Sequence, residues 1–348
     1  MRQASLASIL GLGLGLAQLA QAAGPECRSV TVQTCDLAKA MGRGINFGNM
    51  LEAPREGDWG VRAEQRWIDL AAANFATVRL PVRWTNHAAP TVDARLDEVF
   101  AKRVDVVVDA LLAKGLYVIL DLHHYNQING DALHPNEFGV DPAVLETRLV
   151  NIWRQLGERY KGRSPKLIFE LLNEPHGRLN GEPWNLLAAQ ALAAVRLSNP
   201  SRAVLIGPSY WNNAKDLPKL RMPADSNLIL ALHTYDPLGY THQGVRWIAV
   251  AQPVGTTCCD EPQRKSITTV LDAAKRWSDS NGFPVHVGEF GTVAVAPLDS
   301  REAYTRFIRH EMEARGFSWA YWEFASSMGV YDPKANAWIE PVRKALLD

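Results

Sequence analysis

The chain has 348 residues, 47% of them hydrophobic and 21% charged, which is an ordinary composition for a globular enzyme. Lysine plus arginine and aspartate plus glutamate are balanced at 37 each, so no excess of positive charge points to nucleic acid or to an anionic membrane. We therefore expect neither a nucleic-acid partner nor a membrane partner, and the balance fits a neutral substrate. The length allows two domains, but a single barrel of this size is equally natural.

Residues 1–22 predict a signal peptide. Arg2 supplies a positive start, residues 6–20 supply an apolar core, and Ala20-Gln21-Ala22 is a small-x-small cleavage site. The apolar core is shorter than the roughly 20 residues that a membrane-spanning helix needs. We therefore expect a secreted protein, extracellular or periplasmic, that is cleaved near Ala22 and whose single domain occupies residues 23–348.

Four cysteines follow, and an exported protein is expected to oxidise them. Cys27 and Cys35 flank a β-rich run at residues 30–32, which predicts an N-terminal β-hairpin closed by a disulfide bond. Cys258 and Cys259 are adjacent, so they form either a vicinal disulfide or separate bonds to the first two cysteines; sequence does not choose among the pairings. No cysteine has histidines at metal-ligand spacing, so we expect no zinc site.

Apolar runs with strand character alternate with helical patterns through the rest of the chain. The runs occupy residues 44–48, 77–84, 116–124, 166–175, 202–207, 228–235, 283–291 and 316–324. The clearest helical patterns surround Trp67 to Phe75 and occupy residues 96–114, 143–160, 184–197 and 342–347. Strand and helix repeated in this way predict an α/β fold, a single (β/α)8 TIM barrel preceded by the hairpin.

Two connections are long for a barrel. Residues 125–141 follow the third predicted strand, and residues 237–263 follow the sixth. Loops of this length without clear structure are usually functional or mobile. Because both follow strand C-termini, we expect them to wall a cleft on the face where barrel enzymes place their chemistry.

Two glutamates stand at the ends of predicted strands. Glu174 follows an apolar run and precedes Pro175, which cannot continue a strand ladder. Glu289 lies between two glycines at the end of another apolar run. A single glutamate in such a place is usually a solvated or salt-bridged loop residue, but the pair suggests a site with two carboxylates.

The motifs FELLNEP and VGEFG resemble the acid/base and nucleophile motifs of glycoside hydrolase family 5, the cellulase family. The resemblance implies that Glu174 is the acid/base and Glu289 the nucleophile, in a retaining enzyme whose carboxyls lie ~5–5.5 Å apart. We expect Arg79, on the second strand, to hold Glu289 ionised, although it can also be read as a core salt bridge. Glu174 has to stay protonated, so its pKa is expected above the free value of ~4.3.

The same resemblance extends to the other strand ends. Asn173 is expected to bond a sugar 2-hydroxyl, and Trp322 to offer an apolar face to a sugar ring. The matching set of substrate-binding residues is Arg79, His123, His124, Asn173, His233, Tyr235 and Trp322. Neighbouring strand residues point to opposite faces, so joint metal binding by His123 and His124 is disfavoured. Further candidate sugar platforms in or near loops are Trp59, Tyr125, Trp211, Tyr240 and Trp247.

Residues 44–60 resemble a subgroup of bacterial family 5 enzymes that act on β-1,4-glucans, some of which also accept β-mannans. By that resemblance Asn49 and Glu52 contact the distal sugar. Met50 stands where the subgroup has alanine, and the cysteine-bearing loop after the sixth strand has no counterpart in it. The shape of the cleft, and with it the polymer, is therefore left open.

The sequence leads to the hypothesis of a secreted, retaining endo-β-1,4-glucanase of the cellulase type, without metal or cofactor and monomeric. Its partner would be a β-linked polysaccharide or oligosaccharide. A β-mannanase, a xyloglucanase or a mixed-linkage glucanase is the alternative within the family. A non-catalytic glycan-binding barrel has no need of two catalytic glutamates, and a metal-dependent barrel hydrolase needs a spaced ligand set that the sequence lacks.

Overall fold

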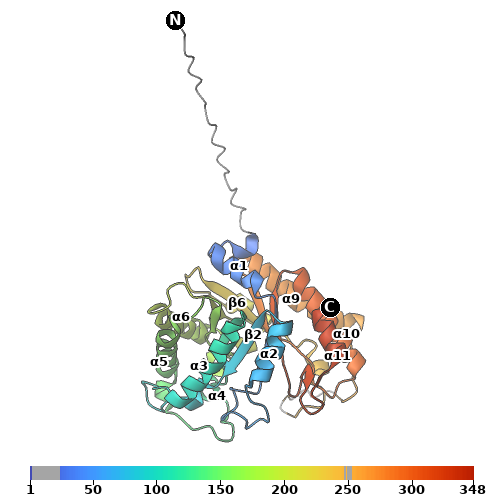
Figure 1. Cartoon of the computed structure of the whole chain (residues 1–348), viewed down its shortest axis with the longest axis horizontal. Helices are drawn as coiled ribbons and strands as arrows, with labels where there is room; N and C mark the ends of the chain where they lie inside the picture. The colour runs from blue at the N-terminus through green and yellow to red at the C-terminus, as the bar shows by residue number, and fades with distance from the viewer. Residues whose placement is uncertain (2–23, 247, 249–252) are drawn as a thin grey trace.

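The computed structural model describes Met1 and residues 24–246, 248 and 253–348 (Figure 1). Apart from Met1, the predicted signal peptide lies outside the described residues, so its processing stays a prediction. In the described part of the chain, no helix is both long and apolar enough to cross a bilayer.

Eight parallel strands close into a barrel in sequence order, with β1 paired to both β2 and β8. The strands are β1 Arg43–Asn46, β2 Thr77–Val82, β3 Tyr117–Leu122, β4 Leu167–Glu170, β5 Val204–Ile206, β6 Leu228–His233, β7 Val285–Glu289 and β8 Ser318–Tyr321. Each lies within, or within one residue of, a predicted apolar run, because strands buried on both faces read as continuous apolar stretches. The predicted (β/α)8 TIM barrel is confirmed.

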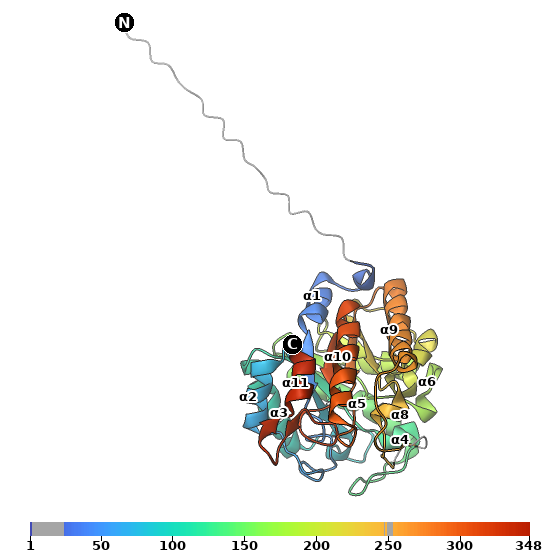
Figure 2. The same cartoon turned by 90° about the vertical axis from the view of Figure 1, so that its right-hand side faces the viewer.

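Helices cover the outside of the barrel (Figures 1 and 2). The longer ones are α2 Gln65–Asn74, α3 Glu98–Ala113, α5 Leu145–Tyr160, α6 Glu182–Arg196, α9 Glu261–Asn281, α10 Leu298–Ala314 and α11 Glu340–Leu347. They are amphipathic: α5, for example, buries Leu149, Ile152 and Trp153 completely against the barrel. This burial is the main source of helix stability in such a layered fold.

The alternation of side chains along each strand divides the barrel into an outer core and an inner one. On β2, Val78 and Leu80 pack outward in the large core beneath the helices. Ile119, Ile168 and Ile229 belong to a separate apolar cluster that fills the inside. Nearer the strand C-termini the inward positions become polar, so the barrel has an apolar floor under a polar mouth.

The predicted N-terminal β-hairpin is wrong. The segment is a short 3₁₀ turn, η1 Pro25–Cys27, followed by helix α1 Val32–Ala40. The β-branched run contains the helix cap instead of a strand, because the Thr31 hydroxyl accepts the Thr34 N–H at 3.1 Å. The Cys27–Cys35 disulfide is present and ties the turn to α1.

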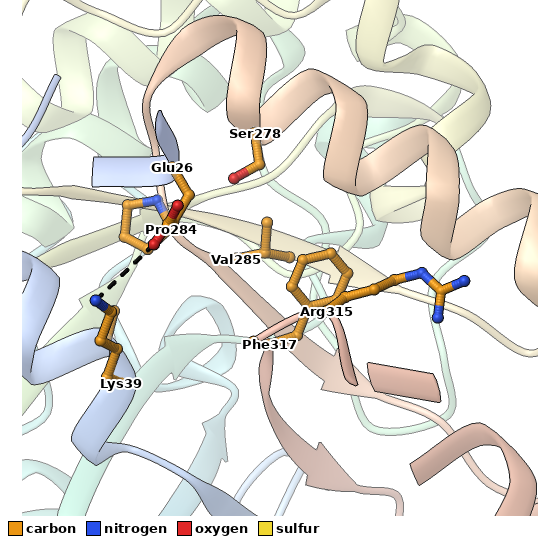
Figure 3. Close-up of a pocket in the computed structure, with 9 residues that line it drawn as sticks. Glu26, Lys39, Ser278, Pro284, Val285, Arg315 and Phe317 are labelled. Carbon is orange, nitrogen blue, oxygen red and sulfur yellow. Dashed lines mark ion pairs between the residues drawn. The ribbon is translucent and has the colours of Figure 1, made fainter. Parts of the chain in front are cut away.

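Helix α1 closes the floor of the barrel. Ala38 and Met41 join the inner apolar cluster there. Figure 2 shows α1 at one end of the molecule and the short helices α4 Asn126–Asn129 and α8 Leu238–Thr241 at the other. A small hollow beside α1, lined partly by the Glu26–Lys39 ion pair, therefore lies away from the strand tips (Figure 3).

The two long connections carry α4 and α8. In the second, Cys258 and Cys259 form a vicinal disulfide, which decides the pairing that the sequence left open. The bond lies directly before Asp260, whose side chain caps α9 in a capping box with Gln263. Earlier in the loop, Gln243 accepts the Gly255 N–H at 2.7 Å and so fastens the segment.

Candidate active site

Glu174 and Glu289 come together at the mouth of the barrel, from the ends of β4 and β7. One oxygen of each carboxyl and one ring nitrogen of His233 all lie within 4.8 Å of one another, and Nδ1 of His233 is 2.8 Å from Glu174 and 3.8 Å from Glu289. Glu174 has a left-handed backbone with φ 49°, a conformation that costs energy for a residue with a side chain. Its side chain is 25% exposed and that of Glu289 is 7% exposed, so a ligand reaches Glu174 more easily.

Glu289 is held by two donors. Arg79 Nη1 donates to one carboxyl oxygen at 2.7 Å, and the Tyr235 hydroxyl donates to the other at 2.8 Å. The expected contact with Arg79 is present. Both donors favour the ionised form, but burial outweighs them and raises the pKa of Glu289 to about 7. Arg79 thus favours the ionised form of Glu289 as expected, but the opposing effect of burial could not be read from the sequence.

Burial likewise raises the pKa of Glu174 to about 7, in the direction expected for an acid catalyst. His233 Nδ1 lies 2.8 Å from its carboxyl, and burial lowers the pKa of His233 to about 4, so this imidazole is neutral. Two carboxyls at this distance do not ionise independently. Since Arg79 contacts Glu289 directly, the proton that the pair retains belongs on Glu174.

Arg79 is the centre of a buried polar cluster. Its guanidinium contacts Glu289, forms a two-point pair with Glu170 at 2.7 and 3.1 Å, and lies 2.9 Å from Asp121. It also donates to Asn173 at 2.8 Å. The residue is thus both a core ion pair and a part of the site, so the two readings of the sequence are compatible.

Sequence reasoning missed Asp121 and Glu170. Both are fully or almost fully buried, and both sit at inward positions of predicted strands that are otherwise apolar. A carboxylate in a buried strand is costly unless it is paired, so an acid at an inward position was the available signal. Asp121 also lies 2.6 Å from Nδ1 of His123, and this contact fixes the ring.

The rings of His123 and Trp322 stack with centroids 5.6 Å apart and planes inclined by 9°. His124 stands across His123, with an interplanar angle of 84°. Burial lowers the pKa of both histidines, so both are neutral. Trp322 and His124 retain partial exposure, which leaves an aromatic surface beside the carboxyl pair.

Asn173 is oriented by its bond to Arg79. Because the amide oxygen accepts from the guanidinium, the amide NH2 group is the part directed to a ligand. Tyr235 keeps its proton, since burial raises its pKa well above the ordinary value. With these two residues, the predicted substrate-binding residues of β2, β3, β4, β6 and β8 all gather around the two glutamates.

Glu52 requires a correction. Its side chain is fully buried and accepts the backbone N–H groups of Asn49 and Met50, so it has no exposed atom for a sugar. Asn49 itself has a left-handed backbone with φ 64° and stays partly exposed, and its side-chain amide donates to the hydroxyl of Ser326. Glu52 therefore shapes the turn that presents Asn49, and only Asn49 remains a candidate for sugar contact.

The loop aromatics separate into two groups. Tyr125 and Tyr240 are buried, whereas Trp59 is 36% and Trp211 is 43% exposed. Trp59 meets His124 edge to face at 5.6 Å, and its other neighbours include the guanidinium of Arg83. Trp247 lies outside the described residues. The two exposed indoles are the remaining candidates for sugar platforms.

Glu174, His233 and Glu289 are also the one group of described residues close enough to share a metal ion. The sequence pattern did not reveal this set, because the three residues come from different strands. The fixed guanidinium of Arg79, 2.7 Å from Glu289, opposes a second cation at the same oxygens. The electrostatics therefore favour a protonated carboxyl pair over a metal centre.

Two carboxyls facing each other across the mouth of an eight-stranded barrel, with neutral hydrogen-bonding groups and exposed aromatics around them, define a glycoside hydrolase. The model of the family Cellulase (glycosyl hydrolase family 5) matches residues 39–327. The chain therefore belongs to glycosyl hydrolase family 5.

Related proteins agree with this assignment. Endoglucanase H of Acetivibrio thermocellus is 34% identical over 93% of this chain, but the match covers only 35% of that protein's length. Solved structures of Thermotoga maritima Cel5A superpose with a TM-score of 0.83, over 89% of this chain and 99% of theirs. One holds mannotriose at 36% identity, and another holds cellobiose at 37% identity.

Proposed function

We propose that the protein is a secreted retaining endo-β-1,4-glucanase in which Glu174 is the acid/base and Glu289 the nucleophile. The observation that carries the proposal is the separation of the two carboxyls. One oxygen of Glu174 and one of Glu289 lie within 4.8 Å of each other. An inverting enzyme needs a wider gap, because a water molecule has to fit between its base and the sugar. Inverting enzymes keep their carboxyls ~6.5–9.5 Å apart.

The reaction then has two steps. The Glu289 carboxylate attacks the anomeric carbon while the glycosidic bond breaks, and Glu174 gives its proton to the departing oxygen. In the second step the Glu174 carboxylate takes a proton from water, which attacks the anomeric carbon and releases Glu289. Arg79 and Tyr235 hold the Glu289 oxygens in place through both steps, and the Asn173 amide bonds the 2-hydroxyl.

A glucan is the first candidate substrate because several relatives, among them those from Acetivibrio thermocellus and Clostridium cellulovorans, are named endoglucanases. The second candidate is a β-mannan, since the Thermotoga maritima enzyme has a complex with mannotriose as well as one with cellobiose. Neither candidate calls for a metal, for a cofactor or for a second copy of the chain. The two disulfide bonds support export, because such bonds persist in oxidising compartments.

The test is reducing-sugar release from soluble β-glucan, carboxymethyl cellulose, xyloglucan, β-mannan and xylan. We expect strong activity on one or two β-1,4 polymers, lost in both Glu174→Gln and Glu289→Gln and unchanged by a chelator. Proton NMR of the first product should show the β-anomer, which establishes retention. Activity that survives both substitutions contradicts the mechanism, and polymer binding without cleavage identifies a glycan-binding barrel.

A further inference from the structure

We infer that Glu170 is a positioning residue that orients Arg79 and shares its charge, and thereby sets the pH range in which the Glu174–Glu289 pair works. The inference rests on the proposed function of that pair. Glu170 lies four residues before Glu174 in the chain, and its hydrogen bonds run to the Arg79 guanidinium and not to either catalytic carboxyl. It therefore acts on the reaction through Arg79 and through its own charge.

The contact between Glu170 and Arg79 is a two-point pair inside the barrel. Nε of Arg79 lies 2.7 Å from one carboxyl oxygen, and Nη2 lies 3.1 Å from the other. Arg79 is 0% and Glu170 is 1% exposed. Such a fork fixes the plane of the guanidinium, not only its position. With that plane fixed, Nη1 is the nitrogen delivered to Glu289, at 2.7 Å.

The strand register explains why Glu170 points there. Phe169 and Leu171 on either side pack outward in the core beneath the helices, so Glu170 points inward. In the β3–β4 pairing its partner is Asp121, the other carboxylate on the guanidinium. Two neighbouring strands thus bring two acids to the side of Arg79 that faces away from Glu289.

The charge balance around Arg79 is unusual. One guanidinium faces the carboxyls of Asp121, Glu170 and Glu289, with Glu174 beyond them. The imidazoles of His123, His233 and His286 also lie inside the mouth, and burial lowers the pKa of each, so none of the three adds positive charge. His176, paired with Asp131, acts on Glu174 from the loop after β4 and is unchanged in the variants below. Burial raises the pKa of Glu170, whereas the two hydrogen bonds from Arg79 favour its ionised form. When it is ionised, Glu170 raises the pKa of Glu174 directly, and by neutralising Arg79 it also raises the pKa of Glu289.

A purely structural role for Glu170 predicts something different. An ion pair that only holds β2 to β4 changes stability and the amount of active enzyme when it is broken. It does not move the limbs of a pH–rate profile, because those limbs report the ionisation of the essential acid and base. The pH profile therefore separates the two roles.

The experiment compares the pH dependence of kcat/KM in Glu170→Gln, Glu170→Asp and the wild type. In Glu170→Gln the charge is lost, and we expect both limbs to move to lower pH by about 1 unit. In Glu170→Asp the charge stays, but the shorter side chain cannot make both hydrogen bonds to Arg79, so the guanidinium is no longer held in its orientation. We therefore expect the limbs to stay in place while kcat falls roughly 10- to 100-fold. The matched control is Asp225→Asn, which breaks the remote, largely buried pair with Arg196.

Unmoved limbs in Glu170→Gln, or a limb shift of equal size in Asp225→Asn, overturn the charge-sharing role. A wild-type kcat in Glu170→Asp overturns the positioning role. A second readout does not depend on catalysis: carbon NMR of enzyme labelled at the glutamate carboxyl carbon follows the titration of Glu174 and Glu289 directly. If the wild type cuts no polymer, the proposed function fails, while the NMR titration still decides the role of Glu170.

Discussion

The indole of Trp211 stacks on the imidazole of His176, with ring centroids 4.5 Å apart and planes inclined by 18°. His176 in turn is fixed by Asp131, 2.7 Å from its Nε2 atom, and the backbone N–H of Trp211 donates to the carbonyl oxygen of Pro175. The loop after β5 is thus fastened to the acid/base loop. The exposed indole of Trp211 thus lies against the two residues that follow Glu174, and we expect it to support the departing part of the substrate chain.

We expect Trp211→Ala to weaken the binding of long substrates more than the hydrolysis of short activated ones. Loss of an aromatic contact of about 0.5–1.5 kcal/mol should raise KM for polymer roughly 2- to 10-fold. Kinetics on polymer and on an aryl cellobioside measure the difference. Leu197→Ala, an exposed apolar residue at the C-terminal end of α6, is the control. An equal loss on both substrates would argue against a platform for the leaving chain.

We expect a bell-shaped pH profile of kcat/KM with its maximum near neutral pH. The reactive form has Glu289 ionised and Glu174 protonated, and burial places the pKa of each at about 7. Activity therefore falls at acid pH as Glu289 takes a proton, and at alkaline pH as Glu174 loses one. Initial rates between pH 4 and pH 10 measure both limbs. A profile that stays flat through neutral pH would contradict the assignment.

Raising the pH from 5 to 8 should lower the free energy of unfolding of the wild type, and we expect Glu52→Gln to make this decrease smaller. Burial raises the pKa of Glu52 to about 8 in the folded protein, so its contribution to stability is present at low pH and is lost as pH rises through that value. The variant stays neutral throughout. Thermal unfolding at pH 5 and at pH 8 gives the free energy of unfolding of variant and wild type. The difference between the two proteins should change by about 2–4 kcal/mol from one pH to the other.

The control for Glu52 is Glu64→Gln, because Glu64 is an exposed carboxyl in an ion pair with Arg66. Its substitution should shift stability equally at both pH values. If Glu52→Gln behaved in the same way, Glu52 would be ionised in the folded protein across this range, and the interpretation of its burial would have to be abandoned.

We expect removal of the first disulfide, by Cys27→Ser with Cys35→Ser, to lower the free energy of unfolding by about 2–3 kcal/mol. The bond joins residues 8 positions apart and so restricts a loop in the unfolded chain. The paired substitution of Cys258 and Cys259 is the control, because their separation of 1 closes almost no chain. Denaturant unfolding measures both, and equal effects would contradict the loop-entropy account.

The barrel could be predicted because its signal is local and repeated. Each buried parallel strand is an apolar run, each helix has its own periodicity, and the order of elements leaves few topologies. The error at the N-terminus has the same origin. Residues 30–32 have strand character by composition, but Thr31 caps a helix, and a stretch this short is decided by its cap and its packing on the barrel floor.

The sequence by itself determined the barrel and the position of the two glutamates. A proline or glycine that ends a strand marks the strand's C-terminus, and the side chain beside it lies at the open end of the barrel. Only the tertiary structure decided what surrounds them. Asp121 and Glu170 became partners of Arg79 through the register of neighbouring strands, and Glu52 turned inward to its own loop. The pKa values of the pair depend on burial, and burial is a property of the closed barrel that no local stretch of sequence contains.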